Sequence, residues 1–240
     1  MTNAVTDPAA EFEHELQVFD NDVDEVVQCF YIWRTVHAAA RTSRKVYDLL
    51  NRNAGFWVVA LGSIQANSLI ALGRIFDTGK STHNVRRLLK LAEENSAIFS
   101  KEAVRQRKNK DLAKTSDLID DYMRNVQDPT ASDFKRLQSF VDARQKVYKR
   151  CYKQLRDKRY AHRERTSISG FVARTNIQEL ARLVTDLRKL HRVLWDWHHN
   201  GIKPRTSRLR GTAGKEIRRD TRKFLKSLIS GTPCGKARRR

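Results

Sequence analysis

The sequence predicts an all-α fold, a bundle of about four main helices with a helical excursion after the third and a basic C-terminal tail. Only four prolines occur among the 240 residues, and Pro8, Pro129 and Pro204 enclose two long proline-free spans, which favour long helices. Apolar residues recur at steps of three and four, the period of a helix face. No segment alternates apolar and polar residues between hairpin turns, so no sheet is predicted.

The first helix is predicted to begin at Pro8, because proline suits the first turn of a helix. It should run to about Leu50 and end within residues 51–55. A sustained heptad pattern supports this length and suits a bundle core or a dimer seam equally well. Its positions are Phe12, Leu16, Phe19, Val23, Val26, Phe30, Trp33, His37 and Ala40.

The second helix is predicted over residues 56–76, with its end at Asp77-Thr78-Gly79. Residues 53–73 carry no charge and approach the length that spans a bilayer. However, they include Ser63, Gln65 and three glycines, which is polar for a lipid-facing helix. We therefore expect a helix buried at the centre of the bundle and no membrane span.

The third helix is predicted to begin after a cap at Ser81 or Thr82 and to end at Glu94. Residues 96–128 are more polar, and we expect a partly helical excursion over 101–114 and a short helix near 117–126. Asp128-Pro129-Thr130 is a break in the pattern.

Ser132 is predicted to cap the next helix, whose apolar face leads directly into residues 156–162. That face comprises Phe134, Leu137, Val141, Val147, Tyr148, Cys151 and Leu155. Asn176 is predicted to cap the last bundle helix, which ends at Asn200, and Gly201 suits the left-handed position that follows. Residues 9–201 are thus expected to form the helical domain, and residues 202–240 a basic tail that is partly helical or disordered.

The charge distribution predicts a polyanionic partner. The net charge is +21 and the pI is about 10.3, which attracts nucleic acid or acidic membrane. Residues 1–33 nevertheless hold eight acidic residues and no Lys or Arg, whereas residues 201–240 hold fourteen Lys or Arg and two acidic residues. The three cysteines are widely spaced, and the start lacks a signal-peptide pattern, so we expect a reducing, cytoplasmic location.

The segment Arg156-Asp157-Lys158-Arg159-Tyr160-Ala161-His162 carries the strongest chemical signal. Histidine takes and gives protons near neutral pH, and arginine keeps its charge and binds phosphate oxygens in a forked geometry. Together they supply what RNA cleavage without a metal needs, a base for the 2′-hydroxyl and a cation for the phosphate.

This segment resembles the signature of HEPN ribonucleases, in which an arginine and a polar residue precede a histidine late in a helical bundle. A second segment, Ser68-Leu69-Ile70-Ala71-Leu72-Gly73-Arg74-Ile75-Phe76-Asp77, is similar to the abortive-infection type U branch, the AbiU-like branch, of HEPN proteins. The resemblance covers about residues 10–200. It implies an endoribonuclease that acts as a toxin or an antiphage effector.

The resemblance assigns His162 as the base and Arg156 as the phosphate-binding cation. Asp157 is expected to orient one of them through a hydrogen bond, or to be an ordinary helix carboxylate among cations. Arg159 is an alternative to Arg156. An ideal helix turns about 600° over six residues and so separates Arg156 from His162 by about 120°, whereas residues three apart share one side. RNA contacts are expected from Arg159, Lys158, Arg163 and Arg74.

The resemblance further implies a homodimer whose two motifs face one cleft, and an antitoxin or a defence-system partner. Some relatives are silenced through a tyrosine two residues after the motif histidine. This chain has Glu164 there, which puts that route in doubt. The main alternative is a helical module that binds nucleic acid or a protein without catalysis.

No cofactor and no metal site are predicted from the sequence. His198-His199 has no acidic or cysteine ligand at a fitting spacing, so a surface role or a cap at a helix end is expected for the pair. His37 is expected to be buried or at an interface. Arg74 is expected either to pair with Asp77 or to contribute to an RNA groove.

Overall fold

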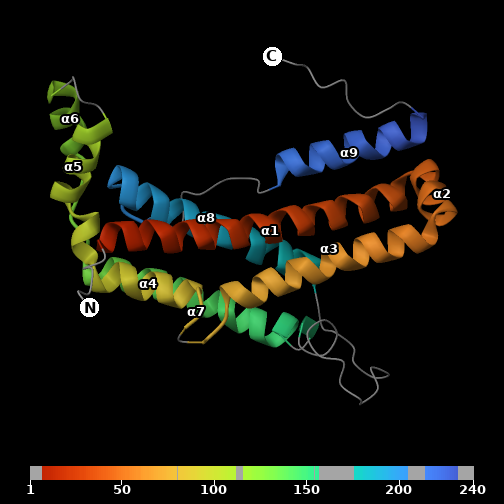
Figure 1. Ribbon diagram of the computed structural model, residues 1–240, viewed down its shortest axis with the longest axis horizontal. Helices are drawn as coiled ribbons and strands as arrows, with labels where there is room; N and C mark the ends of the chain where they lie inside the picture. The colour runs from red at the N-terminus through yellow and green to blue at the C-terminus, as the bar shows by residue number, and fades with distance from the viewer. Residues whose placement is uncertain are drawn as a thin grey trace, which may run out of the picture.

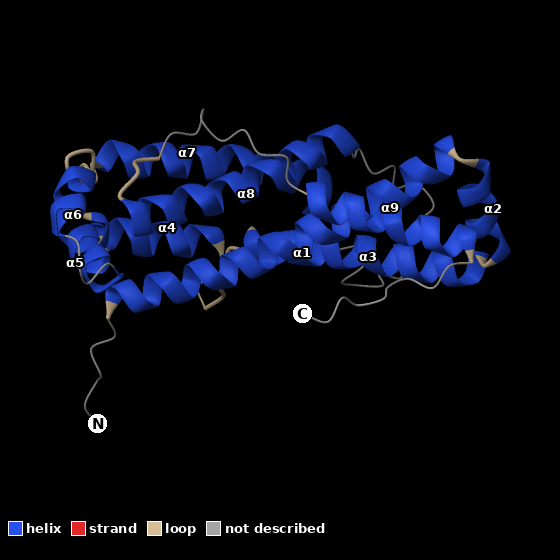
Figure 2. Cartoon of the chain, turned by 90° about the horizontal axis from the view of Figure 1, so that it is seen from above, coloured by secondary structure: helices blue, strands red, loops and turns tan. Residues whose placement is uncertain are grey.

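The computed structural model describes residues 7–79, 81–111, 116–153, 155–156, 176–204 and 214–231. These residues form helices joined by short connections, and no strand occurs among them (Figures 1 and 2). The all-α prediction is confirmed for this part of the chain.

Helix α1 (Pro8–Thr42) runs the length of the molecule and organises the fold (Figure 1). The Asp7 side chain caps it by accepting a hydrogen bond from the backbone N–H of Ala9. Five helices pack against α1, namely α2 (Arg44–Arg52), α3 (Ala54–Ile75), α4 (Val85–Glu94), α8 (Ile177–Asn200) and α9 (Lys215–Ser230). The heptad pattern is buried from Phe12 to Phe30, but His37 is exposed, and its ring lies 4.5 Å from that of Trp33 in a tilted arrangement. Burial of His37 within the bundle was therefore a wrong prediction, and its place at an interface stays a prediction.

The predicted first helix is divided at Ser43. The backbone of Ser43 is extended, with φ −134°, and its Oγ accepts a hydrogen bond from the N–H of Val46. The hydroxyl of Thr42 donates to the carbonyl of Ala38. Serine and threonine side chains compete in this way with the helical backbone pattern, and Ser43 becomes the cap of α2.

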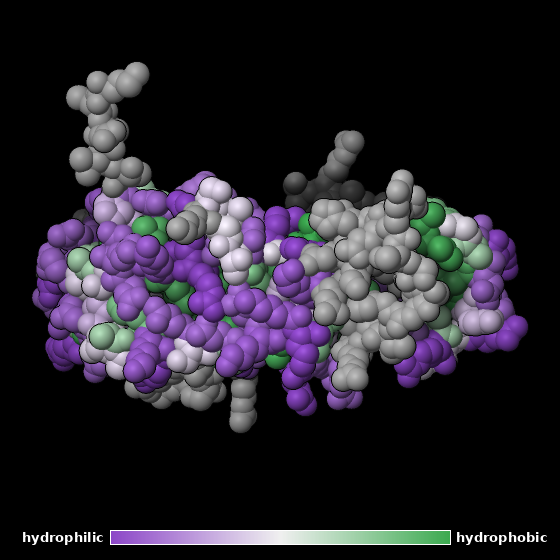
Figure 3. Space-filling model, turned by 90° about the horizontal axis from the view of Figure 1, so that it is seen from below, coloured by the Kyte–Doolittle hydropathy of each residue, from purple (hydrophilic) through white to green (hydrophobic). Residues whose placement is uncertain are grey.

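Helix α3 is buried mainly in its second half, and Leu61 is the buried residue of its first half. Leu69, Leu72 and Ile75 lie in the core, whereas Phe56 is 66% exposed. The prediction that the whole helix lies at the bundle centre is therefore wrong for its first half. By length and composition alone α3 could cross a membrane. A third of its most apolar 18-residue stretch is buried within the protein. Figure 3 shows apolar side chains gathered at this end of the molecule.

The excursion is helical. A 3₁₀ turn, η1 (Ser96–Phe99), leads into α5 (Lys101–Asp111) and α6 (Ser116–Met123), which stand across one end of the bundle (Figure 1). The excursion has a small apolar core of its own, comprising Val104, Ile119, Met123 and Val126. The predicted caps before and after this region are shifted. Asn84, not Ser81 or Thr82, caps α4 through bonds from the N–H groups of Arg86 and Arg87.

Helix α7 (Ala131–Tyr148) begins with a capping box between Thr130 and Asp133, so Thr130 and not Ser132 is the cap. Asp133 is buried and its carboxylate also lies 3.2 Å from Nζ of Lys203. Burial alone would raise the pKa of Asp133, but the hydrogen bonds from Thr130 and Lys203 outweigh it and lower that pKa.

Helix α7 continues into a π-helical turn, η2 (Lys149–Lys153). Helix α8 begins after the predicted cap Asn176, whose Oδ1 accepts from the N–H of Gln178. It ends at Gly201 in the left-handed conformation, with φ 61°. Both ends of α8 were predicted correctly.

Helix α9, which the sequence places in the basic tail, packs against α1 and α2. Leu225 of α9 is buried and joins a small apolar cluster with Val36, Val46 and Leu61. The expectation that residues 202–240 are partly helical is confirmed by α9, and the buried face of this helix is part of the folded bundle.

Candidate functional site

The structure brings together the two segments singled out in the sequence. The side chain of Arg156 lies on Gly73 of α3, so closely that a Cβ added at Gly73 would be 2.7 Å from Cδ of Arg156. Ordinary van der Waals contact of a Cβ begins at 3.4 Å. Only a residue without a side chain at position 73 therefore leaves the arginine in this place.

The end of α3 adds a negative charge beside Arg156. The carboxylate of Asp77 accepts hydrogen bonds from the N–H groups of Thr78, at 2.7 Å, and Gly79, at 3.3 Å. The bond from Thr78 is the main cause of a lowered pKa for Asp77, and the positive charge of Arg156 lowers it further. Asp77 is thus held ionised near the guanidinium of Arg156.

The remaining motif residues, Asp157, Lys158, Arg159, His162 and Arg163, lie outside the described residues. Of the predicted site residues, the structure therefore places Arg156 and Arg74. Arg74 belongs to the last turn of α3, and Arg156 packs against the neighbouring Gly73.

Arg74 faces α1. Its guanidinium contacts Asp22, with 2.7 Å between Nε and Oδ1, and Glu25, with 2.5 Å between NH2 and Oε2. The predicted ion pair with Asp77 is wrong, because packing of α3 on α1 brings two carboxylates closer. An RNA phosphate would compete with both carboxylates for Arg74, which makes Arg74 a weaker candidate for RNA binding than its exposure suggests.

The π-helical turn before Arg156 is fixed to the start of α8. The hydroxyl of Tyr152 donates to the carbonyl of Asn176 at 3.1 Å, and Cys151 Sγ lies 3.1 Å from Oε2 of Glu179. Arg150 also pairs with Glu179. The two ends of the segment between Arg156 and Asn176 are therefore held close together. π-Helical turns frequently occur at functional sites. Beyond the apolar positions of Tyr148 and Cys151, no sequence pattern indicates this turn.

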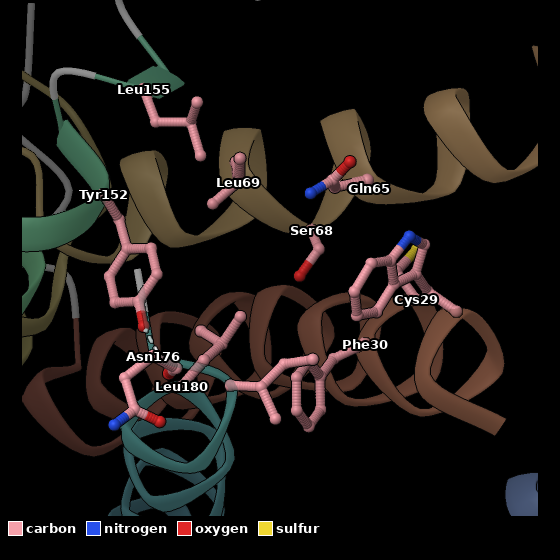
Figure 4. A pocket seen from close by; sticks show the side chains of 11 residues that line it. Cys29, Phe30, Gln65, Ser68, Leu69, Tyr152, Leu155, Asn176 and Leu180 are labelled. Carbon is pink, nitrogen blue, oxygen red and sulfur yellow. Dashed lines mark hydrogen bonds between the residues drawn. The ribbon is translucent and has the colours of Figure 1, made fainter. Parts of the chain in front are cut away.

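A cavity of about 180 Å³ lies between α1, α3, the π-helical turn and the start of α8. Figure 4 shows Tyr152 and Leu155 on one side of it and Ser68 projecting from α3. Its walls are mainly apolar and aromatic, and include Phe30, Trp33 and Leu180. The Oγ of Ser68 is buried and has no hydrogen-bond partner within the described part of the chain.

The acidic residues of α1 are paired with cations of neighbouring helices. Asp20 accepts from Arg188 at 2.7 Å, Asp24 also pairs with Arg188, and Glu15 lies 3.0 Å from Nε of Arg87. This internal pairing leaves the excess positive charge on other surfaces. On α9 the exposed cations are Lys215, Arg219, Arg222, Lys223 and Lys226.

His198 is not a surface residue, contrary to the expectation from the sequence, because its side chain is fully buried. Glu13 of α1 lies beside it, with 3.7 Å between Oε1 and Nδ1 of His198. Sequence spacing could not reveal this acidic neighbour, since the two residues come from opposite ends of the bundle domain.

Comparison with known proteins gives one family. Residues 9–224 match the model of the HEPN family described as AbiU2. The match continues beyond residue 200, where the resemblance was expected to end, and includes most of α9. Searches of curated proteins and of solved structures found no match. Because the family model covers most of the chain, the protein belongs to the AbiU2 family of HEPN proteins.

Proposed function

We propose that this protein is a metal-independent endoribonuclease of the HEPN type. The observation that carries the proposal is the position of Arg156 on Gly73, which joins the Arg–His motif to the other segment that resembles the family. HEPN proteins are in general nuclease-like, and membership of the AbiU2 family supports the same reaction class.

In the proposed reaction, His162 removes the proton from a ribose 2′-hydroxyl. The resulting oxygen attacks the adjacent phosphorus, and the bond to the 5′-oxygen of the next nucleotide breaks. That oxygen leaves with a proton, so the products are a 2′,3′-cyclic phosphate and a 5′-hydroxyl. Arg156 binds the phosphate and stabilises the charge that grows on it, while Asp157 orients the histidine or the arginine.

The surroundings of Arg156 suit this role. Gly73 gives its side chain room, and the bonds from Tyr152 and Cys151 to α8 fix the turn that precedes it. A guanidinium held in place loses little entropy when it binds phosphate, and positioning of this kind lowers the barrier. Lys158, Arg159 and Arg163 would add phosphate contacts, and Arg159 remains the alternative to Arg156.

The proposed biological role is that of a cytoplasmic toxin or antiphage effector, with RNA as substrate and an antitoxin or defence-system protein as a further partner. We further propose a homodimer with two motifs facing one cleft. The exposed apolar residues of α3, Phe56, Val58 and Val59, offer an apolar surface for such a seam.

The second candidate is a non-catalytic module that binds nucleic acid. The observation that favours it is the set of exposed cations on α9, which are far from the Arg–His motif in the sequence. Salt-sensitive binding of RNA needs only such cations. The two candidates differ in whether loss of His162 abolishes cleavage while RNA binding remains.

The test is incubation of the pure protein with mixed cellular RNA in EDTA. We expect cleavage by the parent and none by His162→Ala, with equal RNA binding. Arg156→Lys keeps the charge but loses the forked contact, so cleavage should fall steeply without vanishing. Arg159→Ala tests whether Arg159, in place of Arg156, is the arginine that cleavage requires. Cleavage by His162→Ala at the parental rate would leave only the binding module.

The dimer is tested separately by sedimentation equilibrium at micromolar protein. We expect a dimer in the parent and a weaker one in Val58→Lys, because a charge would then be buried in the seam. A strict monomer that still cleaves RNA would contradict the shared cleft.

A further inference from the structure

Three potential ligands converge where α1 begins and α8 ends, beside α5 (Figure 1). Glu13 projects from the second turn of α1, and His198 and His199 occupy the last turn of α8. One ligand atom from each residue lies within 4.8 Å of the other two. This end of the molecule is separate from the end of α3 that receives Arg156.

His198 has an unusual environment for a histidine. Its side chain is 0% exposed, and neither ring nitrogen has a hydrogen-bond partner within the described residues. A neutral imidazole carries one N–H donor and one acceptor nitrogen, and leaving such groups unpaired inside a protein is costly. The surroundings are aromatic, with Phe12 and Phe99 against the ring, so the fold itself does not satisfy this side chain.

The distance from His198 to Glu13 fits two ligands of one ion better than it fits a hydrogen bond. Nδ1 of His198 and Oε1 of Glu13 are 3.7 Å apart, beyond the range of a hydrogen bond. Two ligands about 2.1 Å from a tetrahedral Zn²⁺ lie about 3.4 Å from each other. The three ligand atoms lie within 4.8 Å of one another, so a central point lies within about 2.8 Å of each, and a shift of about 0.7 Å or less per ligand would complete the coordination.

The charged groups facing the site are Glu13 and Arg107. The NH2 group of Arg107 donates to the carbonyls of Ile98, at 2.8 Å, and His198, at 2.7 Å, so the guanidinium is directed to the backbone. Its charge disfavours a second cation, and the carboxylate of Glu13 opposes this effect. Two imidazoles and one carboxylate favour a metal that binds imidazole nitrogen over Mg²⁺ or Ca²⁺, which need several oxygen ligands.

We propose that Glu13, His198 and His199 form a binding site for Zn²⁺ with a fourth position open to water. The ion would satisfy one buried nitrogen of His198 and would join the start of α1 to the end of α8. Because the site is separate from Arg156, its role is to stabilise the fold, and the proposal does not rest on RNA cleavage.

The test uses the full chain stripped of metal and titrated with Zn²⁺. The readouts are the number of ions bound per chain, the affinity and the melting temperature. We expect one ion bound at this site, a higher melting temperature with Zn²⁺, and affinity at least about tenfold lower in both Glu13→Gln and His199→Gln. Both altered side chains are at least partly exposed, so these variants should fold.

His37→Gln is the matched control, because it removes a histidine that lies on α1, away from the site. His14→Gln and His83→Gln test a different pair, whose rings lie 5.8 Å apart. Zn²⁺ affinity that is unchanged in Glu13→Gln and His199→Gln would overturn the proposal, as would an affinity that depends on His14 and His83 instead. Failure of the stripped parent to bind Zn²⁺ at micromolar concentration would also overturn it.

Discussion

Replacing Gly73 with Ala should separate activity from stability. The added Cβ would lie 2.7 Å from Cδ of Arg156, and ordinary contact begins at 3.4 Å. The arginine side chain must therefore move by about 0.7 Å or more. It can do so because the nearest clashing atom is Nη1, at the far end of a flexible side chain. The backbone gains, since Ala is favoured over Gly inside a helix by about 0.5–1 kcal/mol.

The expected result is a stable protein with impaired chemistry. A displacement of about 1 Å of a positioning group can cost about 100-fold in rate, so kcat/KM for RNA cleavage should fall by about 10- to 100-fold. The melting temperature should be unchanged or raised by about 2–4 °C. Cleavage is followed with a fluorescent oligonucleotide in EDTA, and unfolding is followed by circular dichroism.

Gly62→Ala provides the matched control on the same helix. A Cβ at Gly62 would meet nothing within 4 Å, so this variant makes the same change in helix propensity without displacing Arg156. We expect parental cleavage from it. If Gly73→Ala folds and cleaves RNA as fast as Gly62→Ala, the position of Arg156 on α3 is not the one used in catalysis.

Further predictions concern stability, pH and RNA binding. Leu225→Ala should lower the free energy of unfolding by about 2–5 kcal/mol in urea, because Leu225 is 2% exposed; Phe224→Ala, at a residue 45% exposed, should cost much less. Asp133→Asn should destabilise the protein above about pH 5. The parental advantage should vanish as pH falls below the unfolded pKa and through the lowered folded pKa of Asp133, as measured by urea unfolding at several pH values. Neutralising the exposed cations of α9 should flatten the dependence of log affinity on log salt by about 0.7 per lost contact with single-stranded RNA, and an unchanged slope would place the contacts elsewhere. The five changed residues are Lys215, Arg219, Arg222, Lys223 and Lys226.

The sequence predicted those parts of the fold that local chemistry decides. Asn176 and Gly201 mark the ends of α8 through their own side chain and backbone, so a reader of the sequence can find them. The break at Ser43 is different, because the apolar pattern reaches Ala40 with no stop signal after it, and the serine competes with a helix that would otherwise persist. The exposure of Phe56 likewise depends on which helices reach the first half of α3, and the pattern of α3 alone cannot show this.

The sequence singled out both segments of the candidate site but not the contact between them. Arg156 was found from its motif, and the segment containing Gly73 was found from the same family resemblance. Their contact, however, arises from packing of the chain after α7 on α3. The pairing of Arg74 with Asp22 and Glu25 was missed because α1 and α3 must be folded together before these charges meet. The proximity of Glu13 and His198 was missed for the same reason, because these residues are far apart in the sequence and meet only in the folded protein.

The central place of α1 has a consequence for biosynthesis. The first helix to be made has partners among the last, since Asp20 pairs with Arg188 across 168 positions and α9 also packs on α1. Non-local contacts of this kind slow folding. The apolar positions from Phe12 to Phe30 remain uncovered on the α8 side until that helix has been synthesised. A ribosome-bound chain that stops before α8 thus exposes the apolar face of α1 to chaperones and proteases. Because such a chain cannot complete its bundle, incomplete copies should be degraded before they accumulate.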